Sequence, residues 1–473
     1  MTDLTKNPDL RSREKIDDYF GDWKWREGLA ELMVPIVGRL YRHGVHIMIY
    51  GQSLVNKSPI DIMHAHRFVR QIEENELSEL ETYPLLERLS KMDLPDCEVD
   101  IGELAMRCAF FKDLPSNPDS IDNYLKEQIT VDGLVAQRPD QPQDIVLYGF
   151  GRIGKLALRV LLDRGIKISW INDITGDSEI HAHLLEFDSV HGRWKANINV
   201  NKNSIIVDGH EIIVHQEEKI VDLPFKGIDV VIDCTGAFKT SEKLGPYFEK
   251  GVKKVVVSAP VKDPAAINIV YGINHDLYGA KEYDIVTAAS CTTNCIAPVV
   301  KVLHENLRIK HGSITTIHDV TNTQTIVDRP AKDLRRARSA LNSLIPTSTG
   351  SATAITLIYP ELKGKLNGHA VRVPLLNASL TDCVFELEQA TDVEVVNSLF
   401  KTAAEGNLKN ILGYETKPLV STDYVNDPRS CIIDAQSTMV INDTQVKIYA
   451  WYDNEVGYTH RLVDIVEMVG NKI

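Results

Sequence analysis

The chain has 473 residues, of which 43% are hydrophobic and 25% charged, an ordinary balance for a globular protein. One hydrophobic core rarely serves a chain of this length, so about two to four domains are expected. The formal net charge of −14 argues against general attraction to nucleic acid or to an anionic membrane surface, and no apolar stretch approaches the roughly 18 residues of a membrane span.

The cysteines and the N-terminus bear on the cellular setting. Seven cysteines are scattered without the spacing of metal ligands, so no metal site is predicted. Residues 2–6 are polar, unlike a secretion signal, in which charged residues are followed by apolar ones. These features predict a reducing, cytoplasmic location, with neither a membrane nor a nucleic acid as partner.

Residues 1–136 are predicted to form a mainly α-helical domain. Apolar side chains recur at helical spacing from Leu29 to Leu40, and Asp100 precedes a second such run that reaches Cys108. Aromatic residues in a small helical domain usually belong to its core, and an interface with a partner is the alternative. The aromatic residues in question are Trp23, Trp25, Phe110 and Phe111.

Residues 137–143 are predicted to form a linker, because they are polar and contain two prolines, which continue neither a helix nor a central strand. Beyond the linker, short β-branched runs at 144–148, 230–233 and 255–257 alternate with helix-like segments. This alternation predicts an α/β fold with a parallel sheet and crossover helices.

A glycine-rich turn follows the first of these strands. Gly149, Gly151 and Gly154 have the G-x-G-x-x-G spacing, which permits a tight turn, close approach to a pyrophosphate and a helix start that supplies N–H donors. The next predicted strand, 167–171, ends near Asp173, where a carboxylate binds a ribose 2′-hydroxyl and repels a 2′-phosphate. This context predicts a dinucleotide site that prefers NAD to NADP. A glycine-rich surface turn is the alternative, but it leaves Asp173 unexplained.

Cys291 begins an apolar, helix-patterned run directly after a predicted strand end. A helix N-terminus carries about half a positive charge and unpaired N–H donors, which favour a thiolate over a thiol. Cys291 is therefore a candidate nucleophile. Cys295, one helical turn later, is predicted to be a packing residue, and oxidative pairing with Cys291 is the less favoured alternative.

Six motifs occur in order along the second part of the chain. They are residues 148–155, 290–295 (Ser-Cys-Thr-Thr-Asn-Cys), 315–318, 346–350, 372–374 and 451–458. Together they resemble the phosphorylating glyceraldehyde-3-phosphate dehydrogenase family, from about residue 144 to the C-terminus, and leave an N-terminal extension outside the similarity. The resemblance implies a Rossmann-type NAD-binding domain at 144–290, completed by a C-terminal helix at about 455–473, and an α+β catalytic domain at 291–454.

The resemblance also places His318 beside Cys291 and implies covalent catalysis. Addition of the Cys291 thiolate to an aldehyde gives a hemithioacetal, whose carbon readily gives up a hydride. His318 would stabilise the thiolate as an imidazolium and then take the hemithioacetal proton as a neutral base. A lone histidine is more often a surface or packed residue, so this role depends on the resemblance.

In enzymes of this family inorganic phosphate attacks the resulting thioester, so two anion pockets are implied. Thr321 and Arg372 would hold the phosphate of the substrate, because hydroxyl and guanidinium groups suit a phosphate dianion. Taken singly, such residues more often form caps, turns or surface salt bridges. The residues implied around the attacking phosphate are Ser290, Thr292, Thr349 and Gly350.

The basic stretch 328–338 has two interpretations. A nucleic-acid patch is the less favoured one. The resemblance instead places the stretch in a loop across a subunit interface of a homotetramer, with Arg335 near the attacking phosphate. Besides the three glycines and Asp173, the resemblance implies a further set of cofactor-binding residues, in which Asn454 fixes the nicotinamide carboxamide. This set comprises Arg152, Ile153, Thr235, Ser258 and Asn454.

Three residues depart from the usual pattern of the family. Glu218 stands where an arginine is common, which predicts weaker binding of the cofactor. Arg329 stands where a small or apolar residue is common and would offset the repulsion of a 2′-phosphate by Asp173, so the sequence allows NADP alongside NAD. Asp319 follows His318 where alanine is common. In a continuing strand the side chain of Asp319 is expected to point to the face opposite His318.

The function predicted from these features is NAD-dependent, reversible oxidation of glyceraldehyde 3-phosphate with inorganic phosphate to 1,3-bisphosphoglycerate. The chemical alternative is erythrose-4-phosphate dehydrogenase, which looks similar but releases its acid by attack of water. A regulatory or interaction protein on a dehydrogenase scaffold is the third interpretation. Retention of Cys291, His318 and both anion pockets argues against it. No partner is predicted for residues 1–136.

Overall fold

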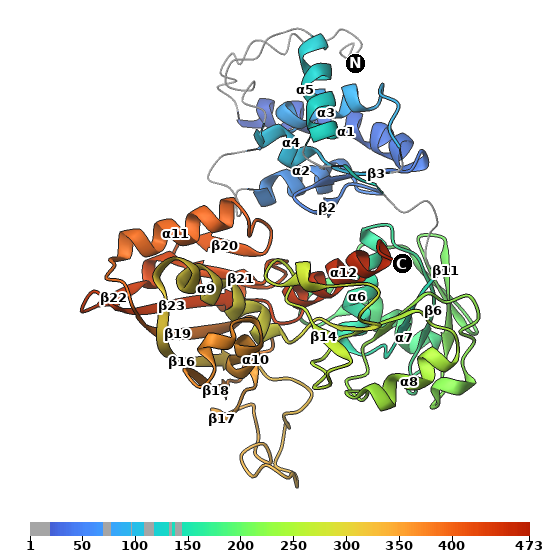
Figure 1. Ribbon diagram of the computed structural model, residues 1–473. Coiled ribbons are helices and arrows are strands. Elements are labelled where there is room, and N and C mark those ends of the chain that lie inside the picture. The colour runs from blue at the N-terminus through green and yellow to red at the C-terminus, as the bar shows by residue number, and fades with distance from the viewer. Residues whose placement is uncertain (1–18, 70–76, 96, 108–117, 132–134, 138–143) are drawn as a thin grey trace. The chain divides into compact units, whose positions relative to one another are not determined.

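The chain divides into two compact units after Pro142. A computed structural model describes residues 19–473 except for 70–76, 96, 108–117, 132–134 and 138–143 (Figure 1). Most of the predicted linker therefore lies outside the described residues, and its bounds stay a prediction. No helix in the described part of the chain is long and apolar enough to cross a bilayer.

The first unit combines helices with a small sheet. In the part that the structure describes, the helices are α1 (Tyr19–Arg42), α2 (Pro59–Phe68), α3 (Glu79–Leu89), α4 (Ile101–Arg107) and α5 (Pro118–Val131). The strands are β1 (Val45–Ile49), β2 (Gln52–Ser53), β3 (Cys97–Asp100) and β4 (Val135–Gln137), in the order β2-β1-β3-β4. The mainly helical character is confirmed. The sheet is not predicted from the sequence, because strands of two to five residues carry too little alternation to be recognised.

The core of the first unit lies between α1 and the sheet. Met33 and Val37 on the inner face of α1 are buried in one cluster with Ile47 of β1. Leu32, which shares the apolar run, is 44% exposed because it lies on the outer face of the helix. Trp23 packs against this core, as expected for an aromatic residue in a small domain. Cys108, Phe110 and Phe111 lie outside the described residues.

The second unit begins with a nine-stranded sheet in the order β14-β15-β13-β12-β5-β6-β11-β10-β9. Its strands are β5 (Ile145–Tyr148), β6 (Ile168–Asn172), β9 (Ile198–Asn201), β10 (Ser204–Val207), β11 (His210–His215), β12 (Val230–Asp233), β13 (Lys254–Val257), β14 (Ala266–Asn268) and β15 (Ile285–Thr287). All neighbours from β14 to β11 pair in parallel, which confirms the predicted parallel sheet. Strand order reverses between β5 and β12, the position at which open α/β sheets bind nucleotides.

Four helices accompany this sheet in the described part of the unit. They are α6 (Arg152–Asp163), α7 (Ser178–Glu186), α8 (Ser241–Glu249) and the C-terminal α12 (Val456–Gly470); β7 (Phe187–Asp188) and β8 (Gly192–Arg193) form a separate ribbon. Leu462 and Val466 of α12 are buried in the same core as Leu158 of α6 and Leu147 of β5. The C-terminal helix therefore completes the core of the nucleotide-type sheet.

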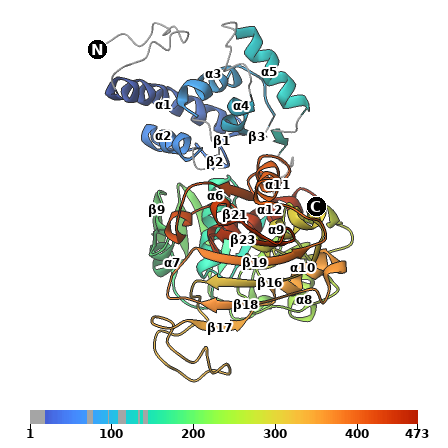
Figure 2. The same cartoon turned by 90° about the vertical axis from the view of Figure 1, so that its left-hand side faces the viewer.

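The rest of the second unit is built on an eight-stranded, mostly antiparallel sheet in the order β17-β18-β16-β19-β23-β21-β20, with β22 paired to β23. Figure 2 shows the part of this sheet from β17 to β21. Its strands are β16 (Ile309–His318), β17 (Ile345–Ser348), β18 (Leu366–Arg372), β19 (Ser379–Leu387), β20 (Leu412–Glu415), β21 (Cys431–Asp434), β22 (Met439–Ile441) and β23 (Gln445–Tyr452). Its helices are α9 (Cys291–Leu307), α10 (Ser351–Ile358) and α11 (Val393–Glu405).

Helix α9 fixes the relation between the two sheets of this unit. Ile296, Val299 and Val300 are fully buried in the core of the eight-stranded sheet. Cys291, at the start of α9, packs against both this core and the core of the nine-stranded sheet. The sulfur is thereby held where the cores of the two sheets meet.

Candidate active site

Cys291 is the first residue of α9, directly after the N-cap residue Ser290. The backbone of Ser290 is extended, and its hydroxyl accepts a hydrogen bond of 3.2 Å from the N–H of Thr293. This cap ends the strand-like approach and starts the helix, so that unpaired N–H groups and the positive end of the helix dipole surround the sulfur.

His318 lies beside Cys291, although 26 residues separate them in the chain. Its Nε2 is 3.7 Å from the Cys291 sulfur, because β16 ends at His318 next to the start of α9. The ring is buried and meets the ring of Tyr452 edge-on at 6.1 Å between centroids. The pair therefore has the geometry that a thiolate and an imidazolium need to stabilise each other.

Electrostatics at His318 favour the imidazolium. Burial by itself lowers the pKa of His318, but hydrogen bonds with Asp319 and with Cys291 outweigh it and raise the pKa to about 9. At neutral pH the ring is therefore mostly protonated. It becomes a base only when its proton is transferred during reaction or when the pH rises.

The prediction for Asp319 is wrong. Strand β16 ends at His318, so the alternation of side chains stops there and Asp319 does not follow it. Its carboxylate is buried, with Oδ1 at 2.8 Å from Nδ1 of His318. Ser379 donates a hydrogen bond of 2.7 Å to the same oxygen, and Asn454 donates one of 3.0 Å to the other.

Arg372 approaches from the neighbouring strand. Its Nη1 is 2.6 Å from Nδ1 of His318 and donates to the backbone oxygen of Asp319 at 2.9 Å. Its Nε is buried without a partner, a donor free to bind an anion. Thr321 lies in the adjacent segment, which is joined to the one after Arg372 by a backbone hydrogen bond of 2.9 Å from Val320 to Leu375.

A second group of hydroxyls gathers where α9 and α10 begin. Ser290 and Thr349 both contact the hydroxyl of Ser351, at 3.3 Å and 3.2 Å. Gly350 is the N-cap residue of α10, so the N–H groups of that helix point at the same place. Sequence reasoning does not identify Ser351, although its position at the start of a helical run was a usable signal.

The other two residues implied around the attacking phosphate are Thr292, whose hydroxyl lies 4.0 Å from the Cys291 sulfur, and Arg335. The hydroxyl of Thr292 is 2.9 Å from that of Tyr452, in the interior beneath the site. Arg335 is exposed on the long loop, whereas its neighbour Arg336 donates to the hydroxyl of Thr347 at 3.0 and 2.9 Å. Contacts of Thr292 and Arg335 with a phosphate therefore stay predictions.

The glycine-rich turn has the shape of a pyrophosphate cradle. Gly149 has φ +93°, and a Cβ there would lie 2.6 Å from the backbone nitrogen of Thr235. A Cβ on Gly151 would meet nothing within 4 Å, so the turn is open on that side. Asp173 accepts a hydrogen bond of 2.8 Å from the N–H of Phe150, which joins the end of β6 to the turn. These features fit a bound dinucleotide.

Asp173 stays ionised in this position. Burial raises the pKa of Asp173, but hydrogen bonds from Thr175 and from the Phe150 N–H outweigh it and hold the pKa below its ordinary value. The charge suits a ribose 2′-hydroxyl and opposes a 2′-phosphate. Thr235 follows the end of β12, and Ser258 follows the end of β13, where its N–H donates to the backbone oxygen of Asp233 at 2.8 Å. Both therefore lie at the same edge of the sheet as the turn.

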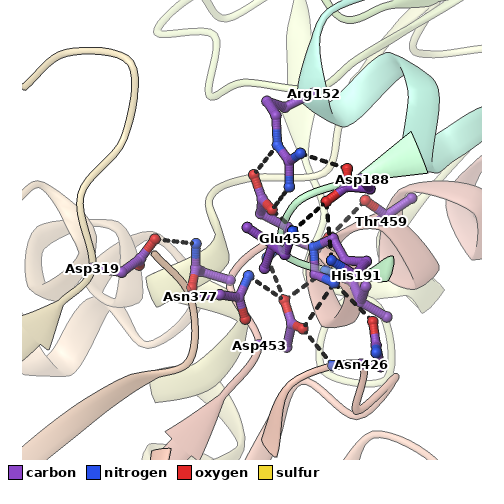
Figure 3. Close-up of polar contacts among 12 residues, drawn as sticks. Arg152, Asp188, His191, Asp319, Asn377, Asn426, Asp453, Glu455 and Thr459 are labelled. Carbon is purple, nitrogen blue, oxygen red and sulfur yellow. Dashed lines mark hydrogen bonds and ion pairs between the residues drawn. The ribbon is translucent and has the colours of Figure 1, made fainter. Parts of the chain in front are cut away.

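Arg152 and Ile153, the remaining residues of the turn, have side chains engaged within the protein. Ile153 packs against the core of the nine-stranded sheet. The guanidinium of Arg152 pairs with Glu455 and, at 2.5 Å, with Asp188 (Figure 3). Each is thus available to a cofactor mainly through its backbone N–H.

The Arg152 ion pairs belong to a network that also fixes Asn454. His191 lies 2.8 Å from Glu455 and 2.7 Å from Asn426, and Asp453 accepts from the N–H of Asn426 at 2.8 Å (Figure 3). Asn454, between Asp453 and Glu455, is buried. The network holds the turn and the residues around Asn454 in one arrangement, which no local sequence pattern predicts.

Comparisons with known proteins agree with this site. Residues 143–241 match the family model described as the NAD binding domain of glyceraldehyde 3-phosphate dehydrogenase, and residues 290–454 match the model of its C-terminal domain. Glyceraldehyde-3-phosphate dehydrogenase 3 of Nostoc sp. is 59% identical over 325 residues, which are 68% of this chain and 96% of the relative. Glyceraldehyde-3-phosphate dehydrogenase of Geobacillus stearothermophilus is 50% identical over 327 residues, 68% of this chain and 97% of the relative.

Proposed function

Since this chain belongs to the glyceraldehyde 3-phosphate dehydrogenase family, we propose that it oxidises glyceraldehyde 3-phosphate with NAD and inorganic phosphate to 1,3-bisphosphoglycerate, reversibly. The observation that carries the proposal is the 3.7 Å approach of the His318 Nε2 to the Cys291 sulfur at the start of α9. A thiol so placed is an activated nucleophile for an aldehyde carbon.

The residues divide the reaction between them. The Cys291 thiolate attacks the aldehyde carbon, and the carbonyl oxygen takes the proton of the His318 imidazolium to become the hydroxyl of a hemithioacetal bonded to the sulfur. His318 takes the proton of that hydroxyl when the carbon is oxidised to a thioester. NAD, when bound, supplies the hydride acceptor. A phosphate oxygen then attacks the thioester carbon, the carbon–sulfur bond breaks, and the thiolate is restored.

Two groups of donors support the anion pockets of this proposal. Arg372, with its unpaired Nε, and Thr321 would hold the phosphate of the substrate. Ser290, Thr349 and the start of α10 at Gly350 would hold the attacking phosphate, because hydroxyl and N–H donors converge there. Asn454 and the residues around the glycine-rich turn would hold the cofactor. NADP as a second cofactor remains a prediction.

We also propose the domain division that the sequence predicts: an extension at 1–136, a linker at 137–143, a nucleotide-binding domain at 144–290 completed by the C-terminal helix, and a catalytic domain at 291–454. The packing of α12 into the core of the nine-stranded sheet supports the discontinuous second domain.

The test of the function is phosphate dependence. The purified chain is expected to reduce NAD with glyceraldehyde 3-phosphate when phosphate or arsenate is present, and to stop after about one turnover per site without either, because the thioester then has no acceptor. NADH absorbance measures this. Sustained turnover without either anion would contradict the proposal and favour hydrolysis, as would a preference for erythrose 4-phosphate under those conditions.

We further propose that the chain forms a homotetramer. The loop between β16 and β17 exposes large apolar side chains, with Leu334 83% exposed and Leu344 68% exposed. Apolar side chains grouped on an irregular loop are typical of a subunit contact. Light scattering of the full chain is expected to give about four times its mass of 53.0 kDa. A monomer at micromolar concentration would contradict the tetramer and leave the catalytic proposal in place.

A further inference from the structure

The carboxylate of Asp319 occupies a position between the general base and Asn454. One oxygen lies 2.8 Å from Nδ1 of His318, and the other accepts from the amide nitrogen of Asn454 at 3.0 Å. Asp319 is 1% exposed, and Ser379 fixes it by donating a hydrogen bond of 2.7 Å. Water therefore does not screen the charge from either neighbour.

The contacts at Nδ1 of His318 assign its proton. Nδ1 lies 2.8 Å from the carboxylate oxygen of Asp319 and 2.9 Å from its backbone oxygen, and because both oxygens only accept hydrogen bonds, they require a hydrogen on Nδ1. Arg372 also lies 2.6 Å from this nitrogen, and two donors cannot satisfy each other. We assign the hydrogen to the contact with Asp319, because the same Nη1 of Arg372 has a second acceptor in the Asp319 backbone oxygen at 2.9 Å.

The contact with Asn454 fixes which end of its amide is free. Because Nδ2 donates to Asp319, this bond orients the amide, and Oδ1 lies 3.4 Å from the Ser379 hydroxyl, whose one hydrogen is directed to Asp319. The assignment of the nitrogen and the oxygen of this amide rests on the hydrogen-bond network. The orientation leaves Oδ1 as the group that can accept from the amide of a nicotinamide.

We propose that Asp319 is a positioning residue, which holds His318 as an Nδ1-protonated imidazolium facing Cys291 and at the same time fixes the amide of Asn454. The inference deepens the proposed function, since it concerns the base of that same reaction. Where an alanine follows the histidine, neither of these two contacts can form.

The sign of the effect follows from the charges around His318. Cys291 faces the ring from α9, Arg372 from β18, Tyr452 from β23 and Asp319 from the end of its own strand. Burial raises the pKa of Tyr452 well above its usual range, so that side chain is neutral. The carboxylate and the thiolate favour the imidazolium, and the guanidinium and burial disfavour it. Removing the carboxylate therefore makes His318 lose its proton at lower pH.

The pH dependence of Cys291 alkylation by iodoacetamide reports the loss of the His318 proton, and the measurement needs neither cofactor nor aldehyde. The thiolate reacts slowly while it is paired with the imidazolium, and faster once His318 is neutral, so the rate rises a second time as His318 loses its proton. For the unmodified chain this rise is expected near the pKa of about 9. In Asp319→Asn and Asp319→Ala it is expected roughly one to two pH units lower. Mass spectrometry of the Cys291 peptide measures the rate.

The Kd for NAD distinguishes the contact of Asp319 with Asn454 from its contact with His318. The carbonyl of Asp319→Asn can still accept from Asn454, so its Kd for NAD is expected to stay within about twofold. Asp319→Ala loses that acceptor, and its Kd is expected to rise about 3- to 10-fold, the worth of one hydrogen bond. Quenching of protein fluorescence measures Kd without turnover.

Asp382→Asn is the matched control. Asp382 also lies on the eight-stranded sheet, but it pairs with Lys447 at 2.7 Å, away from His318. This variant is expected to keep the wild-type alkylation profile and Kd. Folded Asp319 variants with an unshifted second rise would overturn the proposal, and so would failure of both to fold, which would make Asp319 a structural residue. A chain that fails to oxidise glyceraldehyde 3-phosphate but shows the shifted rise would contradict the proposed function alone.

Discussion

Replacing Cys291 by serine is expected to lower kcat for glyceraldehyde 3-phosphate by about 10,000-fold or more, the scale seen when a catalytic nucleophile is removed. A serine hydroxyl stays protonated where a thiol ionises, so the start of α9 and the imidazolium of His318 no longer produce an anion that can attack the aldehyde. NADH absorbance under saturating NAD and phosphate measures the loss. Binding of NAD is expected to change by no more than about twofold, since the cradle around Gly149 does not include the sulfur.

The control for this substitution is Cys295→Ala. Cys295 lies one helical turn along α9, fully buried, with its sulfur 3.7 Å from the hydroxyl of Thr381. Its loss leaves a small cavity and is expected to lower the melting temperature by a few degrees, from about 1 kcal/mol of lost packing. kcat is expected to stay within about threefold, because the sulfur does not face His318. Equal loss of activity in both variants would show that Cys291 acts through packing rather than chemistry.

The sequence predicts those parts of the site whose backbone is determined by a few consecutive residues. The glycine spacing after β5 and the small residues before α9 each encode a turn. Each turn determines the backbone around Gly149 or Cys291 independently of distant parts of the chain. The same applies to the parallel sheet, because few folds other than an α/β sheet accommodate β-branched runs that alternate with helical patterns.

The rest depends on contacts between distant segments, which no local pattern records. Tyr452 supports Thr292 from β23 across 160 residues, and Arg152 meets Glu455 across 303. Asp319 shows why local reasoning also fails at an element boundary: one residue decides whether a side chain follows the strand or turns back, and strand ends are the least certain part of a sequence-based assignment. The short strands of the first unit were missed for a related reason, since each is too brief to show its period.

Replacing His318 by asparagine is expected to lower kcat by about 100- to 10,000-fold, the usual worth of a positioned general base. Two contributions add to this loss. The hemithioacetal proton has no acceptor when the carbon is oxidised, and the thiolate loses the cation that stabilises it 3.7 Å away. The second contribution can be measured alone, because alkylation of Cys291 by iodoacetamide at pH 6 is expected to slow by about tenfold or more once the imidazolium no longer stabilises the thiolate.

His311→Asn is the matched control, because His311 is an exposed histidine on the same strand, β16, far along it from His318. It is expected to keep kcat and the alkylation rate within about twofold. The two readouts for His318→Asn also constrain each other. A large fall in kcat with normal alkylation at pH 6 would mean that the start of α9 alone sustains the thiolate and that His318 acts only as the base. Normal kcat would contradict both roles, since the described part of the chain places no other histidine against the sulfur.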